Sequence, residues 1–312
     1  MPYLEAALAS LLAQDEEDIE FIISDNASQD STEAHCRAVA ARDARVRYSR
    51  NEVNLGAAAN FQRVLSVSTA PYFAWAAHDD VYSSNFISRC LDGLRSRPEA
   101  ALCVPAHRRI DDKGTVISIR QEPPGLASPD LQTRLRAHLS RRAWLTIYGL
   151  WRKEVLMQIG PPLPIWGSDV ILVWRALLVA PIETIPEPLA DYRVFLEKTA
   201  DATMFGVTGS ESRLHFPHTG MLRELKRASE GLGLSENDRQ VAAGVLRRWV
   251  LTPSYRQLAF ADLWLESRRY WSEGAKLRAL ALLPPMAVLS PRMGLNGLHH
   301  VWRNYRGDRG HS

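Results

Sequence analysis

The sequence predicts an α/β fold with a doubly wound, mostly parallel sheet, followed by a helical C-terminal region. Three observations support this prediction. Apolar runs of strand length alternate with stretches of helical spacing through residues 1–105, and turn-forming residues follow several of the runs. From about residue 203 the pattern becomes helical and amphipathic. Alternation of strand and helix is typical of a parallel sheet with helices on both faces.

Each N-terminal element has its own justification. Leu4, Leu8 and Leu11 recur at helical spacing, and the run IEFIIS at Ile19–Ser24 has the composition of a buried strand. The turn Asn54-Leu55-Gly56 precedes a further helical stretch. The expected helices are Tyr3–Gln14, Asp30–Arg42, Ala57–Val67 and Ser84–Ser96, and the expected strands are Ile19–Ser24, Val46–Ser49, Tyr72–Ala77 and Ala101–Pro105.

The regular alternation ends near residue 105. A hairpin is expected around Asp111–Gly114, followed by helices at Leu131–Leu139 and Ser168–Val179. Ile182–Arg193 contains two prolines and receives no element type. We therefore expect three parts, at residues 1–105, 106–202 and 203–312, of which the last is helical.

Two adjacent carboxylates, Asp79 and Asp80, follow the apolar run at Tyr72–Ala77. Ligands of open α/β sheets bind at the carboxyl ends of the strands. Two carboxylates in a small space need a cation, and hard oxygen ligands suit Mg²⁺ or Mn²⁺, which usually accompany a phosphate-bearing substrate. The pair Asp111-Asp112 lies among turn formers instead, and is expected to be solvated.

Composition sets further limits. The chain has 312 residues and a formal charge of +3, which is too small to indicate a nucleic-acid partner. Its three cysteines lack metal-ligand spacing and are expected to be buried free thiols in a reducing compartment. No secretory signal or membrane-spanning segment is predicted. The expected location is the cytoplasm.

Taken together, the motifs resemble those of family 2 glycosyltransferases, nucleotide-sugar enzymes with a GT-A fold. The resemblance extends from Tyr3 to about Arg193, and the order and spacing of the motifs make it specific. The motifs are YLEAALASLLAQ, IEFIISDNASQDST, RNEVNLGAAANF, YFAWAAHDD, IYGLWRKEVL, GSDVILVWRALL and IPEPLADYRV. The resemblance implies glycosyl transfer from a nucleoside-diphosphate sugar, with a UDP-sugar as the default donor. It also implies that residues 1–105 are the nucleotide-sugar-binding half, which lacks the family's first strand, and that residues 106–202 are the acceptor-binding half, followed by the helical region at 203–312.

The resemblance also implies a donor site. Asp25 is expected to accept a hydrogen bond from the nucleotide base, although an Asp at a turn start is the simpler interpretation. Asn54, Gly56 and Asn60 are expected to shape the pocket, and Gly56 also fits an ordinary turn. Asp79 is expected at the ribose or near the metal.

The catalytic half follows in the same way. Asp80 is implied as the ligand of Mn²⁺ or Mg²⁺, and Arg193 as a contact of the diphosphate. Asp169 matches the general base of an inverting transfer, but an Asp at a helix start is also a favoured cap. Trp166 either stacks on the acceptor sugar or packs. Phe195 stands where the family often has histidine, which weakens the expectation of a second phosphate or metal contact.

Several alternatives stay open at this stage. The family's first strand, which normally precedes the YLEAAL helix, is not found in this sequence. We expect the true start of the protein to lie upstream; a truncated, non-catalytic nucleotide-sugar-binding protein or scaffold is the second hypothesis. Widely separated Asp25, Asp80 and Asp169 side chains would favour it. The acceptor is expected to be a saccharide or a lipid-linked saccharide of the cell surface. In that case the basic, amphipathic C-terminal helices are expected to contact the membrane peripherally.

Overall fold

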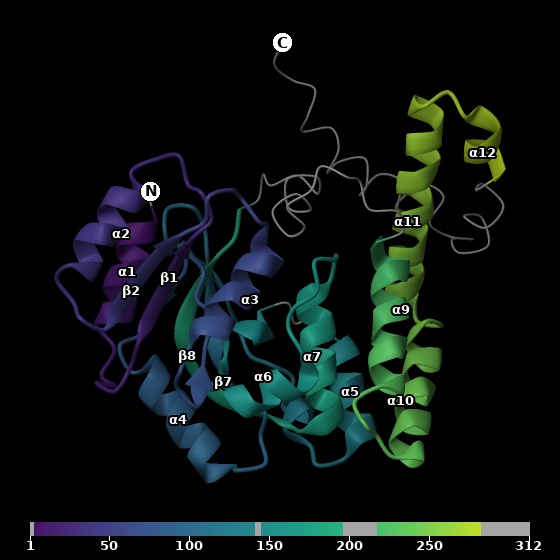
Figure 1. Cartoon of the computed structure of the whole chain (residues 1–312). Coiled ribbons are helices and arrows are strands. Elements are labelled where there is room, and N and C mark those ends of the chain that lie inside the picture. The colour runs from purple at the N-terminus through teal and green to yellow at the C-terminus, as the bar shows by residue number, and fades with distance from the viewer. Residues whose placement is uncertain (1–2, 141–144, 196–216, 282–312) are drawn as a thin grey trace.

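Strands and helices alternate through the N-terminal part of the chain, as predicted. The structure is a computed structural model, and it describes residues 3–140, 145–195 and 217–281 (Figure 1). The first elements are α1 (Leu4–Leu12), β1 (Phe21–Asp25), α2 (Thr32–Ala40), β2 (Val46–Arg50) and α3 (Ala57–Val67). Their types agree with the predictions, and their bounds differ only at the ends, where assignments are least certain.

β1 and β2 form a parallel two-stranded sheet of their own, in register from Phe21 opposite Val46 to Asp25 opposite Arg50. Parallel pairing brings the carboxyl ends of both strands to one edge, so Asp25 and Arg50 are neighbours. A small cluster of buried residues packs against this sheet; it consists of Leu4, Leu8 and Cys36, with Ile23, Val39 and Tyr48 partly buried around it.

The second sheet has the order β3-β7-β5-β8-β4, with β6 paired to β5. Its strands are β3 (Tyr72–Phe73), β4 (Val81–Tyr82), β5 (Leu102–Ile110), β6 (Val116–Arg120), β7 (Leu150–Arg152) and β8 (Ile182–Arg193). The α/β class is confirmed. Among the described residues the two longest ladders, β1–β2 and β5–β8, are parallel, and the four shorter pairings are antiparallel. A tight turn joins β5 to β6, which forces antiparallel pairing there.

One predicted strand is much shorter than expected. Only Tyr72 and Phe73 of the Tyr72–Ala77 run pair in the sheet, with Arg152 and Trp151. Of the remaining residues, Trp75 is buried by side-chain packing: it is 3% exposed, and its indole N–H donates to the carbonyl of Phe61 at 3.1 Å. Ala76 is exposed, so the apolar run predicted the burial of Phe73 and Trp75 but not a strand of its full length.

β8 has no counterpart in the predictions. Its prolines, Pro186 and Pro188, lie where its register with β5 shifts, so the missing N–H groups interrupt the ladder only locally. The predicted strand at Ala101–Pro105 also extends further, to Ile110, because β8 continues alongside it.

The helices that follow are largely those predicted. They are α4 (Phe86–Ser96), α5 (Leu131–Ser140), α6 (Lys153–Ile159), α7 (Ser168–Val179), α9 (Pro217–Glu230), α10 (Glu236–Trp249), α11 (Pro253–Ser272) and α12 (Lys276–Ala281), with short 3-10 turns at Pro124–Ala127 and Thr146–Tyr148. In α7, eight of twelve residues are buried. A helix that is apolar on all sides lies inside the protein. Figure 1 shows α7 between the sheet and the C-terminal helices.

The C-terminal helices share the main core of the protein. Leu225, Val245, Leu246 and Leu258 belong to the same buried cluster as α7 and the strands of the large sheet. The helical region therefore packs on the core. Within the described ranges, no helix is long and apolar enough to cross a membrane. Cys36, Cys90 and Cys103 are free and buried, as predicted.

Gly149→Ala is expected to lower stability strongly. A Cβ at Gly149 would lie 2.5 Å from the backbone oxygen of Cys103 and 2.8 Å from Cγ2 of Val104, so β5 and β7 would have to separate. Overpacking of this kind costs about 1–3 kcal/mol. The midpoint of urea unfolding measures it. Gly244→Ala in α10 is the matched control, since its Cβ meets only the end of Arg248 at 3.7 Å, and it should stabilise the helix. Equal midpoints for the two variants would contradict this account.

Candidate active site

Asp25, the last residue of β1, is a buried carboxylate with fixed partners. Its Oδ1 accepts a hydrogen bond from the backbone N–H of Ser28 at 2.8 Å, and its Oδ2 accepts one from the Tyr48 hydroxyl at 2.9 Å. Arg50 Nε lies 3.4 Å from Oδ2. Burial by itself raises the pKa of Asp25, but the bonds from Ser28 and Tyr48 and the charge of Arg50 outweigh it and lower the pKa. Asp25 is therefore ionised, and its side chain is fully covered by these partners and their neighbours.

Asn60, in the first turns of α3, ties that helix to β1. Its Oδ1 accepts hydrogen bonds from Ser24 Oγ at 2.6 Å and from Asn51 Nδ2 at 3.0 Å, and its Nδ2 donates to the Ser24 carbonyl at 3.0 Å. The next residue, Phe61, stacks on Trp75 with ring centroids 5.7 Å apart. α3 thus contacts the small sheet through Asn60 and the main core through Phe61.

Asn54 and Gly56 form the loop that leads into α3. Asn54 Oδ1 accepts hydrogen bonds from Asn26 Nδ2 at 2.7 Å and from the backbone N–H of Gly56 at 2.9 Å. Gly56 has φ +79°, in the left-handed region that favours glycine. The four linked amides, Asn26, Asn51, Asn54 and Asn60, are called the asparagine network below. The structure brings Asn54, Gly56 and Asn60 together with the end of β1, next to Asp25.

Asp79 and Asp80 lie directly before β4, not after a long strand as predicted. They are 9% and 5% exposed. Since β4 pairs antiparallel with the end of β8, Asp80 comes close to Arg193, and its Oδ1 accepts the backbone N–H of Arg193 at 2.9 Å. The preceding His78 is 75% exposed at its side chain and lies 3.8 Å from Asp79.

Arg193 braces the segment that carries the two aspartates. Its Nε donates to the carbonyl of Asp79 at 3.1 Å, and its Nη1 donates to the carbonyls of Asp111 at 2.6 Å and Asp112 at 3.1 Å. Its guanidinium carbon lies 4.3 Å from the centre of the Tyr3 ring. The hairpin turn at Asp111-Asp112 is confirmed, and its carbonyls hold this arginine. The Nη2 of Arg193 makes no hydrogen bond to any residue that the structure describes.

Tyr148 is half-buried between α3 and β8. Burial raises its pKa, and the charges of Asp80, Asp169 and Asp79 raise it further. Its ring contacts Phe61 of α3 at 6.4 Å and Tyr192 of β8 at 5.7 Å between centroids. Elements from distant parts of the sequence therefore converge here.

Asp169 is the second residue of α7, which begins after Gly167 in the left-handed region at φ +74°. It is half-buried, and its Oδ1 accepts the N–H of Val170 at 2.9 Å. Burial raises the pKa of Asp169 to about 6, and the bond from Val170 offsets only part of the effect. A carboxyl group with this pKa is largely ionised at neutral pH and is well suited to take up a proton.

Trp166 packs against the helical region. Its ring meets that of His218 edge-on, with centroids 5.9 Å apart and planes at 79°. The packing interpretation of Trp166 is thus realised in the structure, and a contact with acceptor sugar stays a prediction. Asp25 stands apart from the carboxylates at Tyr148, on the small sheet, and is joined to them through α3.

Sequence reasoning missed several residues of this site. Asn26, Asn51 and Tyr148 all lie inside the motifs quoted above, but no role was given to them. Tyr48 lies on β2 and bonds Asp25, which the period-two pattern of a strand could have suggested. His218 carried no local pattern at all.

The carboxylates of Asp79 and Asp80 are suited to hold a metal ion only when the phosphates of a bound substrate complete its coordination. In the described ranges, no three His, Cys, Asp or Glu side chains gather closely enough to hold an ion. Mg²⁺, however, is usually bound by one or two carboxylates plus substrate phosphates rather than by an all-protein cage. The two carboxylates meet that requirement, so we expect metal and diphosphate to bind together.

The fold defines the class of protein: it is a GT-A fold, the fold of glycosyltransferases. Two solved structures are similar to the chain. S. aureus TarS 1–349 in complex with UDP-GlcNAc has a TM-score of 0.59 at 14% identity, over 84% of this chain and 76% of TarS. The Pyrobaculum calidifontis mannosyltransferase PcManGT, in complex with GDP-Man and Mn²⁺, has a TM-score of 0.51 at 16% identity, over 93% and 76%. At these identities the likeness shows the fold.

Residues 1–152 match the family model described as Glycosyl transferase family 2, and over these residues the chain belongs to that family. An uncharacterized protein of Mycobacterium tuberculosis is 28% identical over 308 residues, covering 96% of this chain and 80% of its own length. An uncharacterized glycosyltransferase of Rickettsia felis is 29% identical over 128 residues, covering 41% of this chain and 21% of its own length. The recognised family is confirmed.

Proposed function

We propose that this protein is an inverting, metal-dependent glycosyltransferase, which transfers a sugar from a nucleoside-diphosphate sugar to a hydroxyl of a saccharide or lipid-linked acceptor. The observation that carries the proposal is the buried pair Asp79 and Asp80 directly before β4, together with Asp169 at the start of α7, where burial raises its pKa to about 6. The scaffold alternative expects Asp25, Asp80 and Asp169 to be widely separated. Asp25 does stand apart on the small sheet, whereas the charges of Asp80 and Asp169 both act on Tyr148.

The donor is assigned to the small sheet and α3. An ionised Asp25 accepts an N–H of the base, as uracil and guanine both provide, and the asparagine network forms the wall beside it. Donor binding is also supported by TarS and PcManGT, whose structures contain UDP-GlcNAc and GDP-Man. A UDP-sugar is the default donor, with guanosine and thymidine donors open. The division into a donor half, an acceptor half and a helical region follows from this assignment.

The diphosphate is assigned to Asp80 and Arg193. Asp80 is the carboxylate that would hold Mn²⁺ or Mg²⁺, and Asp79 lies beside it towards the ribose. The cation, when bound with the donor, supplies positive charge where the leaving diphosphate becomes more negative. Arg193 keeps the aspartate segment in place through its Nε and Nη1, and its Nη2 is directed to a phosphate oxygen.

Asp169 acts as the general base. The acceptor oxygen forms a bond to the anomeric carbon while the bond from that carbon to the phosphate oxygen breaks, and its electron pair leaves with the diphosphate. The acceptor proton passes to the Asp169 carboxylate. Because the base stands opposite the leaving group, the configuration at the anomeric carbon inverts. Tyr148, whose pKa is raised, stays protonated and can donate a hydrogen bond among these carboxylates.

A lipid-linked acceptor of cell-surface polysaccharide synthesis would place the protein at a membrane. In the segment VLRRWVL, Val245 and Leu246 face the core, whereas Arg247 and Arg248 are exposed and Leu251 is 68% exposed. These exposed residues have the composition of a surface that contacts anionic lipid. We therefore also propose that these residues contact the cytoplasmic face of the membrane peripherally.

Calorimetry with UDP, GDP and dTDP, with and without Mn²⁺, tests the donor site. We expect one nucleotide to bind in a Mn²⁺-dependent manner, and Asp25→Asn to weaken it about 10- to 100-fold, since a hydrogen bond to a charged group is worth roughly 1.5–3 kcal/mol. Asp18→Asn, an exposed carboxylate in the loop before β1, is the matched control. Failure of the folded protein to bind any of the three would favour the non-catalytic alternative.

A further inference from the structure

β6 forms one edge of the large sheet. It pairs with β5, and no other strand that the structure describes pairs with its outer side. In an antiparallel ladder the backbone N–H and C=O groups of a strand point to both of its sides, so about half of those in β6 face away from β5. Such a row of unpaired backbone groups is a template on which a further strand can pair.

The side chains of β6 add an apolar surface to this open edge. Val116, Ile117 and Ile119 are 50%, 49% and 59% exposed, so three β-branched residues meet solvent within four positions. Edge strands are usually protected by charged side chains, and β2 follows that rule, because the Arg47 side chain on it is exposed. The charged residue of β6 is Arg120 at its last position, so most of the strand lacks this protection.

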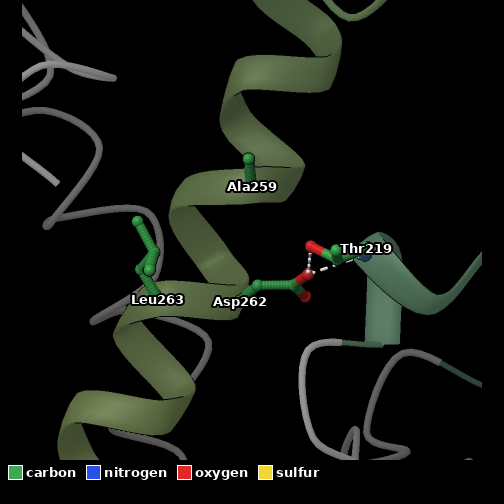
Figure 2. A pocket seen from close by; sticks show the side chains of 4 residues that line it. All are labelled: Thr219, Ala259, Asp262 and Leu263. Atoms are coloured by element: carbon green, nitrogen blue, oxygen red, sulfur yellow. Dashed lines mark hydrogen bonds between the residues drawn. The ribbon is translucent and has the colours of Figure 1, made fainter. Parts of the chain in front are cut away.

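The C-terminal helices, in contrast, are joined to each other within one chain. Figure 2 shows Asp262 of α11 directed at Thr219 in the first turn of α9, and its carboxylate accepts the backbone N–H and the hydroxyl of Thr219, both at 2.8 Å. It also accepts the backbone N–H of His218 at 3.1 Å. The exposed Leu251 and Leu277 lie singly on separate segments. Among the described residues, β6 therefore carries the densest run of exposed large apolar side chains.

The charges at the two ends of β6 have opposite signs. The turn before the strand contains Asp111, Asp112 and Lys113, which together leave one net negative charge, and Asp112 is exposed. At the other end Arg120 is exposed, whereas Glu122 beyond it is half-buried. Neither Asp112 nor Arg120 forms an ion pair with a residue that the structure describes. Two antiparallel copies of β6 would bring the negative end of each next to the positive end of the other.

We propose that β6 is the interface of a homodimer, in which the outer edges of two β6 strands pair antiparallel across a two-fold axis. An isologous contact of this kind uses the same patch on both subunits, and the charges of β6 complement themselves in that arrangement. Ile117 and Ile119 lie in the contact, and Arg120 lies towards Asp112 of the partner subunit. The inference goes beyond the proposed function. The interface borders the candidate site through the turn whose carbonyls hold Arg193.

Sedimentation velocity of the full chain over a series of protein concentrations tests the dimer. A strand of five residues gives a small interface, which is typical of weak association, so we expect the average mass to rise towards that of a dimer with concentration. Ile119→Lys is expected to weaken dimerisation about tenfold or more, because the symmetric contact contains the change twice. Met157→Lys on α6, an apolar residue that is 67% exposed elsewhere, is the matched control.

An exchange of charges tests the antiparallel arrangement itself. Arg120→Glu and Asp112→Lys each place like charges together at both ends of a homodimer, so either variant alone should dimerise more weakly than the wild type. A mixture of the two variants has opposite charges at both ends of the mixed dimer, and we expect dimerisation to recover. Recovery supports the proposed pairing, and a mixture that stays as weak as its components overturns it.

Two further outcomes overturn the dimer. One is a wild-type protein that stays monomeric at every concentration. The other is undiminished dimerisation of Ile119→Lys, which would place the contact between copies on another surface. If the wild type is monomeric and its binding to vesicles of anionic lipid falls in Ile119→Lys, the exposed strand contacts a membrane instead of a second copy.

Discussion

Replacing Asp80 with Ala is expected to abolish the Mn²⁺-dependent part of nucleotide binding and to lower the transfer rate about a hundred- to a thousandfold, the usual loss for a group that stabilises transition-state charge. The described residues offer only two carboxylates at this place, and no third ligand compensates. The variant also removes the acceptor of the Arg193 backbone N–H, 2.9 Å away. UDP titration in the presence and absence of Mn²⁺ measures the effect.

The second aspartate pair supplies the control for Asp80. Asp112→Ala removes an exposed carboxylate but keeps the backbone carbonyl that binds Arg193. It should leave nucleotide affinity within about twofold, because a solvated surface charge is worth little. Equal Mn²⁺ dependence in Asp80→Ala and the wild type would show that the metal, if it binds, is held elsewhere.

Asp169→Asn is expected to lower transfer about a hundred- to ten-thousandfold while leaving UDP binding intact, because a positioned general base contributes that much. In the wild type, kcat/KM should rise with pH through about 6, the pKa of the ionising Asp169, and then level off. The asparagine variant keeps the size of the side chain and its oxygen, but takes up no proton. A pH profile without this rise would remove Asp169 from the role.

The same substitution should stabilise the fold. The pKa of Asp169 rises from 3.8 to about 6 on folding, so the stability that its protonated form contributes is complete below pH 3.8 and is lost as the pH passes 6. Above pH 6 the half-buried, ionised carboxylate of Asp169 lowers the free energy of unfolding. Asparagine carries no such cost, so we expect a gain of about 1–3 kcal/mol at pH 7 and almost none at pH 4.

Urea unfolding at both pH values tests that gain, with the exposed Asp92→Asn on α4 as control. A gain that is the same at pH 4 and pH 7 would mean that ionisation is not its cause. A variant that is both inactive and more stable would show that this position is kept for chemistry at the expense of stability.

Helices with clear boundaries were the most predictable part of this fold. The predicted bounds of two helices, Ala57–Val67 and Ser168–Val179, are those observed for α3 and α7. Each helix begins directly after a glycine with a positive φ, a backbone conformation typical of turns, which marks its start. Strands were less predictable. An apolar run such as Tyr72–Ala77 reports burial, and burial can come from Trp75 packing on Phe61 as well as from a sheet. The two prolines of β8 kept the sequence from predicting this strand. They are tolerated because the register between β5 and β8 shifts there, and such a shift depends on both strands.

The residues of the candidate site likewise divide into those that a local motif predicted and those that it did not. Asp25, Asp80 and Asp169 were named because each lies within a short motif with a resemblance to a family. Tyr148 was not, since its importance comes from carboxylates on two other segments. His218 and Asp262 are 44 residues apart on separate helices, and only the packing of α9 against α11 brings them together. Contacts of this kind are decided by tertiary structure, and no local pattern records them.

The small apolar cluster under β1 and β2 has a consequence for the dynamics of the protein. Leu4, Leu8 and Cys36 bury little surface compared with the core around α7. Segments with few buried contacts open at lower free energy than the protein as a whole. We therefore expect amide hydrogens of β1 and β2 to exchange with solvent faster than those of β5 and β8. A bound nucleotide, contacting Asp25 and α3 together, would slow this exchange, so the donor would complete the folding of the site it occupies.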